Sequence, residues 1–413
     1  MTDQRLIAPA TATGTAVDTV ARAWTFDDLR ADTLGLRAKV APGARASLRS
    51  DDAGVVAAAM SALDGWASEV HLLPGDAAVD ASGTVRIDVE RSGSVTPETA
   101  ADEHTTDWIL YTSGTTGTAK PVRHTGVSLA RRVATTLRAA ELRWGLLYDP
   151  NRMAGTQVLL QSLLSGAYLA APPLDAPLRE RVRMLVESKV NALSATPTLW
   201  RMMLRLPSLE LRLRQITLGG EIADQPTLDA LRARFPDARI VHIFAATETG
   251  AVFSVTDGRA GFPIDYLDDA AAGVSLAVRD GVLHVYRPGA AEADGDGFIA
   301  TGDVVERVGD RMVFCGRASG VINVGGANVS PEAVERMLRT HPAVADVVVK
   351  ARPNSVTGNV LVADVVPSSD AEPATLTKEL RAHVRGQAPR THVPASITFV
   401  PALEVAATGK AER

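Results

Sequence analysis

Residues 111–122 read YTSGTTGTAKPV, and this stretch decides how the rest of the chain is interpreted. It begins at the end of an apolar run, residues 108–111, that is typical of a buried strand. Glycine lets the main chain turn tightly and approach a ligand, while hydroxyl groups and a lysine supply donors and a positive charge that suit phosphate. The composition therefore predicts a phosphate-binding loop, but a surface turn rich in serine, threonine and glycine would share it.

The spacing of this loop excludes a Walker motif, which places its lysine directly after the last glycine. Here two residues separate Gly117 from Lys120. Pro121 follows at once and disfavours helical geometry at Lys120. We therefore do not expect the loop to open a helix.

The stretch resembles the signature loop of the adenylate-forming superfamily, which includes acyl-CoA and aryl-CoA ligases, adenylation domains of nonribosomal peptide synthetases and beetle luciferase. The family pattern, Y/F-T/S-S-G-S/T-T-G-x-P-K-G, is matched except at Ala119 and Pro121, where proline and glycine are commoner. The resemblance implies that the loop binds the β- and γ-phosphates of ATP. The residues that would do so are Thr112, Ser113, Gly114, Thr115, Thr116, Gly117 and Lys120.

Two later motifs resemble the nucleotide site of the same superfamily. The first is a turn against which adenine would lie, formed by Gly219, Gly220 and Glu221. The second, F-A-A-T-E at 244–248, resembles the pattern Y/F-G-x-T-E. By this resemblance Phe244 would stack on adenine, Thr247 would bind the α-phosphate and Glu248 would hold Mg²⁺. A hard cation held by oxygen ligands suits the charge that develops around the α-phosphorus.

Two more motifs complete the series in the family's order. T-G-D at 301–303 and G-R at 316–317 resemble the segment that assigns both ribose hydroxyls to Asp303 and places Arg317 in the nucleotide site. The end of the chain, T-G-K at 408–410, resembles the family's last motif. Its lysine, Lys410, would bridge the attacking carboxylate and the α-phosphate, which aligns both groups and stabilises the developing charge.

The resemblance predicts an α/β fold of two domains. Residues 1–317 would form a large adenylation domain of mixed sheets packed with helices, trimmed at its N-terminus relative to the superfamily. Residues 318–413 would form a small, mobile α+β lid. Within the expected domains, helices are predicted at 53–66, 128–142 and 376–385 from their apolar spacing.

The start of the predicted lid carries the expected hinge and thiol tunnel. Ser319 takes the hinge position, where aspartate or lysine is usual, and a small residue can absorb the change in backbone angles. The turn with Gly325 and Gly326 resembles the one that lines the pantetheine tunnel in acyl-CoA ligases. Gly320 and Asn323 depart from the commoner aspartate and lysine. Just after the turn, Ser330 and Pro331 are expected to begin a helix.

The acid pocket is expected around residues 152–169, which resemble the family's F-H-x-x-G segment and the helix after it. Arg152 replaces the usual histidine or aromatic residue. It is either a solvated arginine at a helix start, which we favour, or a group that faces the substrate and binds a second carboxylate. Met153 stands where amino-acid-activating relatives carry aspartate, so an α-amino acid is disfavoured. Further pocket residues would be Ala245 and Ala246.

Composition bounds the remaining possibilities. The chain has 413 residues, 46% of them hydrophobic, and a net charge of -5, which argues against a nucleic-acid surface. Its single cysteine fits a reducing compartment, and no His/Cys cluster has the spacing of a zinc site. A signal peptide and an apolar run near the roughly 20 residues of a membrane span are both missing. We expect a cytoplasmic monomer or homodimer that binds neither membrane nor nucleic acid.

The implied reaction has two steps. A carboxylic acid and MgATP give an acyl-adenylate and pyrophosphate, and a thiol of CoA or of a carrier protein then captures the acyl group. The V-G-G turn and the helix after it favour an aryl or alkyl acid, and the short N-terminal region favours a specialised biosynthetic pathway. Since no carrier domain follows Arg413, the phosphopantetheine is expected on a separate protein.

Two alternatives remain open. One is an adenylating enzyme that transfers to an amine or hydroxyl, which the departures at Ser319, Gly320 and Asn323 favour slightly. The other is a non-catalytic nucleotide-binding relative. Against it stand the retained residues Lys120, Thr247, Glu248, Asp303, Arg317 and Lys410.

Overall fold

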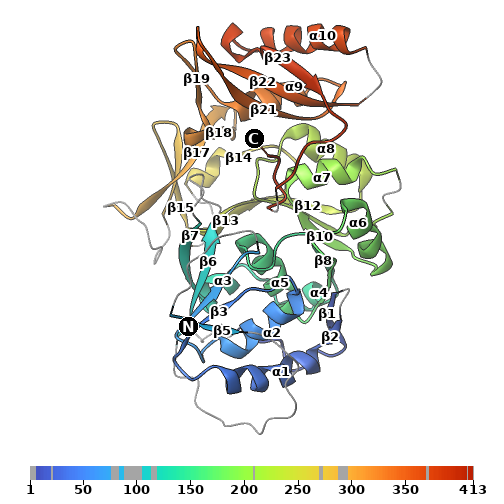
Figure 1. Ribbon diagram of the computed structural model, residues 1–413, viewed down its shortest axis with the longest axis vertical. Helices are drawn as coiled ribbons and strands as arrows, with labels where there is room; N and C mark the ends of the chain where they lie inside the picture. Colours follow the sequence, from blue (N-terminus) through green and yellow to red (C-terminus); the bar gives the residue numbers. More distant parts are fainter. Residues whose placement is uncertain are drawn as a thin grey trace.

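The computed structural model describes residues 6–19, 22–75, 83–87, 105–112, 119–207, 210–268, 273–286, 296–368, 372–406 and 408–412. A large N-terminal part carries a small C-terminal part on one side, and the last residues run back between the two (Figure 1). Most of the predicted phosphate loop lies outside the described residues, namely Ser113, Gly114, Thr115, Thr116 and Gly117.

The largest sheet has eight strands in the order β13-β12-β11-β10-β8-β9-β1-β2. They are β1 (Thr15–Thr19), β2 (Ala23–Thr25), β8 (Arg143–Leu146), β9 (Tyr168–Ala171), β10 (Ala192–Ala195), β11 (Gln215–Leu218), β12 (Arg239–Ala246) and β13 (Gly250–Val255). Neighbours from β12 to β1 pair in parallel, whereas β13 and β2 pair antiparallel at the edges. Parallel pairing needs crossover connections. These contain α5 (Met153–Ser165), α6 (Leu178–Glu187), α7 (Pro197–Leu204) and α8 (Gln225–Arg234).

A second, mostly parallel sheet has the order β5-β3-β4-β6-β7. Its strands are β3 (Arg45–Leu48), β4 (Glu69–Leu72), β5 (Val85–Ile87), β6 (Asp107–Thr112) and β7 (Lys120–Thr125). β6 and β7 form an antiparallel pair in which Thr112 faces Lys120. The predicted phosphate loop therefore connects two strands and opens no helix, as its Pro121 indicated.

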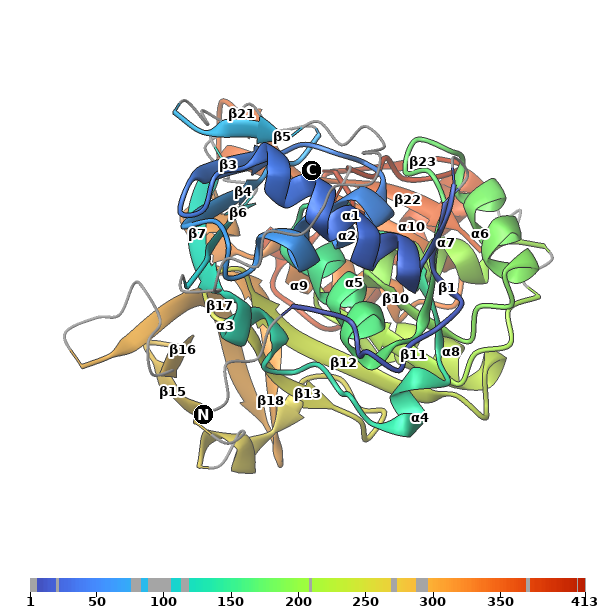
Figure 2. The same cartoon turned by 90° about the horizontal axis from the view of Figure 1, so that it is seen from below.

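One hydrophobic core joins these two sheets. It contains side chains of β3, β4 and β6 together with side chains of β8, β9 and α5. α1 (Phe26–Lys39) and α2 (Ala53–Leu63) lie side by side (Figure 2). Nearly every residue of α2 is buried, which explains why its sequence is apolar all round rather than along one stripe.

A third, antiparallel sheet has the order β14-β18-β17-β16-β15. Its strands are β14 (Phe262–Pro263), β15 (Ser275–Arg279), β16 (Val282–Tyr286), β17 (Phe298–Val308) and β18 (Arg311–Arg317), with the 3₁₀ turn η1 (Ile264–Leu267) after β14. Its own core is rich in phenylalanine and packs against β13.

The C-terminal part is a separate α+β unit with a core of valine and leucine. After the 3₁₀ turn η2 (Ala318–Gly320) come the hairpin β19 (Ile322–Val324) and β20 (Ala327–Val329), then α9 (Pro331–Arg339), β21 (Val344–Asn354), β22 (Gly358–Pro367), α10 (Pro373–Arg385), the 3₁₀ turn η3 (Arg390–His392) and β23 (Ser396–Phe399). Ser330 caps α9 by accepting from the Ala333 N–H at 3.2 Å, and Pro331 is its first residue, as predicted. The predicted α/β fold with a small α+β second domain is confirmed, and the boundary between residues 317 and 318 stays a prediction.

One predicted helix is wrong. The segment 128–142 is not continuous but forms two short helices, α3 (Gly126–Ala130) and α4 (Leu137–Ala140). The side chain of Gln161, on α5, accepts from the Ala134 N–H at 3.0 Å and donates to its carbonyl at 2.9 Å. These bonds replace the helical partners of Ala134, so a residue from a distant element sets the break.

None of the helices in the described ranges has the length and apolar character needed to cross a membrane.

Candidate active site

Two of the nucleotide motifs lie at the carboxyl edge of the largest sheet. Gly219, Gly220 and Glu221 follow β11, while residues 244–246 end β12, its parallel neighbour. Carboxyl ends of parallel strands meet at one edge, where ligands bind in open α/β sheets. Thr247 and Glu248 occupy the turn from β12 to β13. The motif therefore begins on the strand itself and not in a loop after it.

The C-terminal end motif docks at this edge. Residues 404–406 pair with residues 410–412: the Ala406 N–H donates to the Lys410 carbonyl at 2.9 Å, and Val405 pairs with Ala411. The Thr196 hydroxyl, just before α7, donates to the Gly409 carbonyl and also caps α7 by accepting from the Leu199 N–H at 3.2 Å. Thr196 is a residue that the sequence motifs did not single out.

Glycine is favoured at position 409, where the final turn packs against α7. Its φ is +76°, in the left-handed region, and a Cβ there would lie 2.8 Å from Leu199 Cδ1. A side chain at this position would strain the backbone and displace the Leu199 side chain, so glycine favours the close fit against α7 that brings the next residue, Lys410, to the sheet edge.

Lys410 reaches both remaining parts of the predicted nucleotide site. Its Cε lies 3.7 Å from the point that a Cβ on Gly220 would occupy. It also acts on Asp303: burial raises the pKa of the Asp303 carboxyl above its ordinary value, while the charges of Arg317 and Lys410 oppose that rise. The adenine turn, the ribose aspartate and the terminal lysine, far apart in the sequence, thus meet at one place.

Asp303 and Arg317 face each other across β17 and β18. The Arg317 Nε lies 3.5 Å from Asp303 Oδ1, and its Nη2 donates to the Thr301 carbonyl at 2.8 Å. The Thr301 hydroxyl accepts from the Asp303 N–H at 3.1 Å. Only 20% of the Asp303 side chain is exposed, so the carboxylate is held at the wall of the site with defined orientation.

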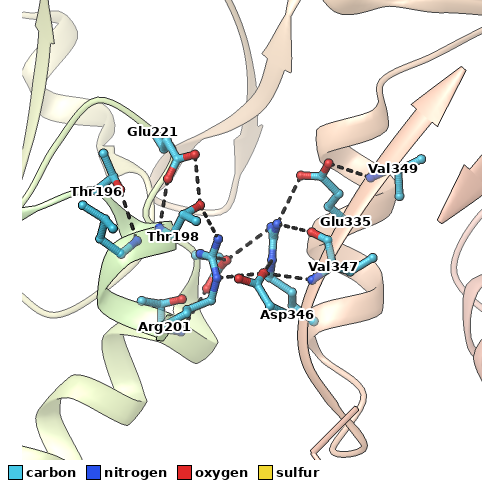
Figure 3. Close-up of polar contacts among 12 residues, drawn as sticks. Thr196, Thr198, Arg201, Glu221, Glu335, Asp346, Val347 and Val349 are labelled. Carbon is cyan, nitrogen blue, oxygen red and sulfur yellow. Dashed lines mark hydrogen bonds and ion pairs between the residues drawn. The ribbon is translucent and has the colours of Figure 1, made fainter. Parts of the chain in front are cut away.

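Glu221 turns its carboxylate toward α7. It accepts from the Thr198 N–H at 2.9 Å and from the Thr198 hydroxyl at 3.0 Å (Figure 3). A carboxylate on the first turn of a helix is stabilised by the exposed N–H groups and the helix dipole. This bond fixes the turn that begins at Gly219, and it leaves the main chain as the surface that could receive adenine.

Phe244 belongs to an aromatic cluster. Its ring stacks on Phe253 and on Phe314, with centroids 5.2 Å away in both cases and interplanar angles of 17° and 15°. Within the described residues, the Phe244 ring therefore packs between two other aromatic rings. Its role under adenine stays a prediction, and it requires a ring surface that these two neighbours leave uncovered.

Arg152 differs from the expectation that we favoured. It is the N-cap residue of α5 without a side-chain cap bond, and only 13% of its side chain is exposed. Its Nε lies 3.8 Å from Asp149 Oδ2. Burial raises the pKa of the Asp149 carboxyl, against the opposing effects of Asn151 and Arg152. Arg152 is thus a largely buried arginine beside a buried carboxylate, and its side chain is not extended into solvent.

The backbone of residues 149–150 crosses closely over α5. A Cβ on Gly155 would lie 2.0 Å from the Asp149 carbonyl oxygen, so only glycine fits. Next to Arg152, Met153 is half-buried against the main core. On β12, Ala245 is exposed and Ala246 half-buried. Whether these side chains contact an acid stays a prediction.

The predicted hinge and tunnel residues lie on the C-terminal part. Ser319 is exposed in η2, and Gly325 and Gly326 form the turn between β19 and β20 with φ values of +58° and +88°. The Asn323 side chain accepts from the Gly326 N–H at 3.1 Å. Asparagine in place of the usual lysine therefore has a structural use, since it closes the glycine turn.

The residues present fit a magnesium ion that arrives with a nucleotide. Among the described residues, no group of three histidine, cysteine or acidic side chains could hold a metal by itself. Glu248 is exposed beside Thr247 in the turn after β12. Mg²⁺ is commonly held by one or two carboxylates together with substrate phosphates, which is the ligand set that this turn offers.

Sequence comparisons match both parts of the chain. The family model described as AMP-binding enzyme matches residues 35–289, and the AMP-binding enzyme C-terminal domain matches residues 333–410. The human acyl-coenzyme A synthetase ACSM2B, mitochondrial, is 28% identical over 74% of this chain, which spans only 59% of that relative's length. The 2-succinylbenzoate–CoA ligase of Listeria innocua is 26% identical over 83% of this chain and 77% of its own.

Solved structures show the same fold. The anthranilate CoA ligase AuaEII, in complex with anthranoyl-AMP, has a TM-score of 0.77 at 20% identity and covers 98% of this chain and 93% of its own. The amide bond synthetase McbA from Marinactinospora thermotolerans has a TM-score of 0.75 at 19% identity, with 97% and 96% covered.

Proposed function

Because the chain belongs to the AMP-binding enzyme family, we propose that it activates a carboxylic acid with ATP and transfers the acyl group to a thiol. The observation that carries this proposal is the position of Lys410, which lies against Gly220 and acts on the charge of Asp303. A cation at the adenine turn and beside the ribose carboxylate is placed for the α-phosphate between them.

In the first step an oxygen of the acid attacks the α-phosphorus, and the bond to the β-phosphate oxygen breaks. Pyrophosphate leaves with the electron pair, so no proton is transferred. Asp303 accepts hydrogen bonds from the ribose hydroxyls, Thr247 donates to the α-phosphate, and Lys410 lies between carboxylate and phosphate. Thr112 and Lys120, which face each other at the neck of the loop, bind the terminal phosphates. Mg²⁺ beside Glu248 would supply charge neutralisation.

In the second step a thiol gives its proton to water and its sulfur bonds to the acyl carbon. The bond from that carbon to the phosphate oxygen breaks, and AMP leaves with the electron pair. Because Lys410 lies against the turn at Gly220, we infer that the C-terminal part has the orientation that serves the first step. The second step would follow a rotation at Ser319 that brings the turn with Gly325 and Gly326 to the acyl-adenylate. CoA and a separate carrier protein are the expected thiol donors.

We propose an aryl or alkyl acid as the substrate. Met153 offers no negative charge for an α-ammonium group. The V-G-G turn at 324–326 and the helix after it resemble those of aryl and alkyl acid ligases. The two relatives named above are, by name, an acyl-coenzyme A synthetase and a ligase that joins 2-succinylbenzoate, an aryl acid, to CoA. A dicarboxylic acid is a specific subclass to test, because Arg152 brings a buried guanidinium to the start of α5.

The proposal is tested by product analysis. The protein is incubated with MgATP and a panel of aryl, alkyl, dicarboxylic and amino acids, and acyl-adenylate and AMP are measured by mass spectrometry. CoA, a phosphopantetheinylated carrier or an amine is then added. We expect a thioester with CoA or the carrier. An amide or ester with no thioester would instead establish the non-thiol alternative, which the unusual residues Ser319, Gly320 and Asn323 favour.

A further inference from the structure

The N-terminal and C-terminal parts meet at a cluster of four buried charges, which we call the interdomain cluster. Arg201 on α7 and Asp224, the N-cap of α8, come from the N-terminal part. Arg339 on α9 and Asp346 on β21 come from the C-terminal part. None of these residues belongs to a sequence motif of the nucleotide site.

Each arginine of the cluster contacts both aspartates. Across the interface, Arg201 Nε lies 2.9 Å from Asp346 Oδ1, and Arg339 Nη1 lies 3.5 Å from Asp224 Oδ2. Within each part, Arg201 Nη1 lies 3.6 Å from Asp224 Oδ2, and Arg339 Nε lies 3.3 Å from Asp346 Oδ1. The charges therefore alternate in sign around a closed ring.

The side chains of the cluster are largely shielded from solvent. The two aspartate side chains are 2% exposed, that of Arg201 is 9% and that of Arg339 is 12%. Burial lowers the pKa of the Arg339 guanidinium, but Glu335, Asp224 and Asp346 outweigh it and hold that pKa above its ordinary value. Burial likewise raises the pKa of Asp224, yet Arg339 and Arg201 bring it below its ordinary value. The arrangement therefore favours the charged forms of Arg339 and Asp224.

Hydrogen bonds connect the cluster to the main chain of the C-terminal part and to a side chain of the N-terminal part. On the C-terminal side, Asp346 accepts from the Val347 N–H at 2.8 Å, and Glu335 contacts Arg339 at 3.2 Å and the Val349 N–H at 2.9 Å (Figure 3). On the other side, Arg201 donates to the Thr198 hydroxyl at 2.9 Å. That hydroxyl donates to Glu221, next to Gly220.

Among the described residues, α7 contacts the C-terminal domain at its start and in its last turn, and its C-cap residue Arg205 also donates to the Pro401 carbonyl at 3.2 Å. Thr196, at its start, binds the Gly409 carbonyl beside Lys410, and Arg201, in its last turn, binds Asp346 on β21. The first point is a single hydrogen bond to the final loop, whereas the second binds the folded body of the domain. The contact between Arg201 and Asp346 therefore fixes the position of the domain from which the final loop extends to the edge of the largest sheet.

We propose that the interdomain cluster positions the C-terminal domain for acid adenylation and separates for thioester formation. Arg201, Asp224, Arg339 and Asp346 are positioning residues, and this inference rests on the proposed function. Separation leaves Arg201 with Asp224 and leaves Arg339 with Asp346 and Glu335, so every charge keeps a partner of opposite sign. An unpaired buried charge, which would block the movement, is avoided in both states.

The test separates the two half-reactions. Asp346→Asn, Arg201→Gln and the double variant are compared with wild type for acid-dependent pyrophosphate exchange and for thioester formation from supplied acyl-adenylate. We expect exchange to fall by roughly 10- to 100-fold, as for a misplaced catalytic group, while thioester formation is unchanged or faster. The double variant should lose no more than the worse single variant. Equal losses in both half-reactions, or none in exchange, would overturn the proposal.

The matched control is Lys350→Gln. Lys350 Nζ lies 3.2 Å from Asp364 Oδ2, an ion pair within the C-terminal domain that does not reach the interface. This variant should leave both half-reactions at the wild-type level. Thermal unfolding of all variants identifies any that fail to fold.

Hydrogen exchange tests the cluster without any substrate. In Asp346→Asn, peptides covering residues 196–204 and 404–412 should exchange faster than in wild type and in Lys350→Gln, because the domain leaves α7. Unchanged protection would overturn the positioning role whatever the activity. Wild-type protein that adenylates no acid, but shows this faster exchange in the variant, would refute the proposed function alone.

Discussion

The Cε of Lys410 lies 3.7 Å from the place of a Cβ on Gly220, so the terminal lysine rests against the turn that follows β11. Gly220 has a φ of +81°, in the left-handed region that favours glycine, so the turn against which Lys410 packs keeps this backbone conformation without strain.

Thr196 should be required for docking of the final loop. Thr196→Val removes the donor to the Gly409 carbonyl and the cap of α7, and loss of such a cap costs about 1 kcal/mol. We expect lower pyrophosphate exchange and a slightly lower melting temperature. Thr196→Ser keeps the hydroxyl and should restore both. Equal exchange by the valine variant and wild type would show that this bond does not matter.

Asp303 should destabilise the ligand-free protein at neutral and higher pH. Burial raises the folded-state pKa of its carboxyl above the unfolded value, so the folded state binds the proton more tightly. The resulting penalty is absent below the unfolded pKa and reaches its full size once pH exceeds the folded pKa. Asp303→Asn should therefore melt at a higher temperature than wild type at about pH 8, with a smaller difference at about pH 5.

The same variant should bind ATP less tightly, since an amide offers one oxygen acceptor where the carboxylate offers two. ATP should raise its melting temperature less than that of wild type. A variant that is less stable than wild type at the higher pH would contradict this account of Asp303.

Gly155 should tolerate no side chain. An alanine Cβ would lie 2.0 Å from the Asp149 carbonyl oxygen, so the backbone over α5 must move. We expect Gly155→Ala to lower the free energy of unfolding by about 1–3 kcal/mol or more, as measured by urea denaturation. Gly386→Ala is the control, because its nearest contact is an ordinary 3.6 Å. Comparable losses in both variants would mean that the close approach is not the cause.

The buried pair of Arg152 and Asp149 should behave as a unit. Arg152→Met leaves the buried Asp149 carboxyl without its nearby cation, although Asn151 still donates to it, and we expect the free energy of unfolding to fall by roughly 1 kcal/mol. Adding Asp149→Asn should recover part of this loss in urea unfolding. Strictly additive losses would show that the two side chains are not coupled. A rise in KM for dicarboxylic acids alone, with unchanged stability, would assign Arg152 to substrate binding instead.

The sequence was most informative where chemistry dictates residue type. Glycine turns at strand ends, the capping serine Ser330 and the proline after Lys120 all have local causes, and the structure confirms the elements that they predicted. The break near Ala134 was not predictable from the segment itself, because Gln161 on α5 supplies the hydrogen bonds that sustain it.

The ion pairs at the domain interface could not be predicted from the sequence either, because their partners lie on distant elements. In the sequence nothing distinguishes Arg201, in an amphipathic helix, or Asp346, near the start of a strand, from ordinary surface charges. They become buried only when two domains meet, and no periodicity or spacing within one segment reports on that meeting. Arg152 shows the same limit, since its burial depends on Asp149 and on how the chain crosses α5.

The most direct test of the central claim is acid-dependent exchange of labelled pyrophosphate into ATP by wild type and by Lys410→Ala. We predict exchange with an aryl or alkyl acid, and a loss of roughly 10²- to 10³-fold in the variant, the cost of removing one preorganised charge-stabilising group. Thioester formation from supplied acyl-adenylate should be unaffected. Undiminished exchange in Lys410→Ala, or equal losses in both half-reactions, would contradict the assignment of Lys410 to the adenylation step.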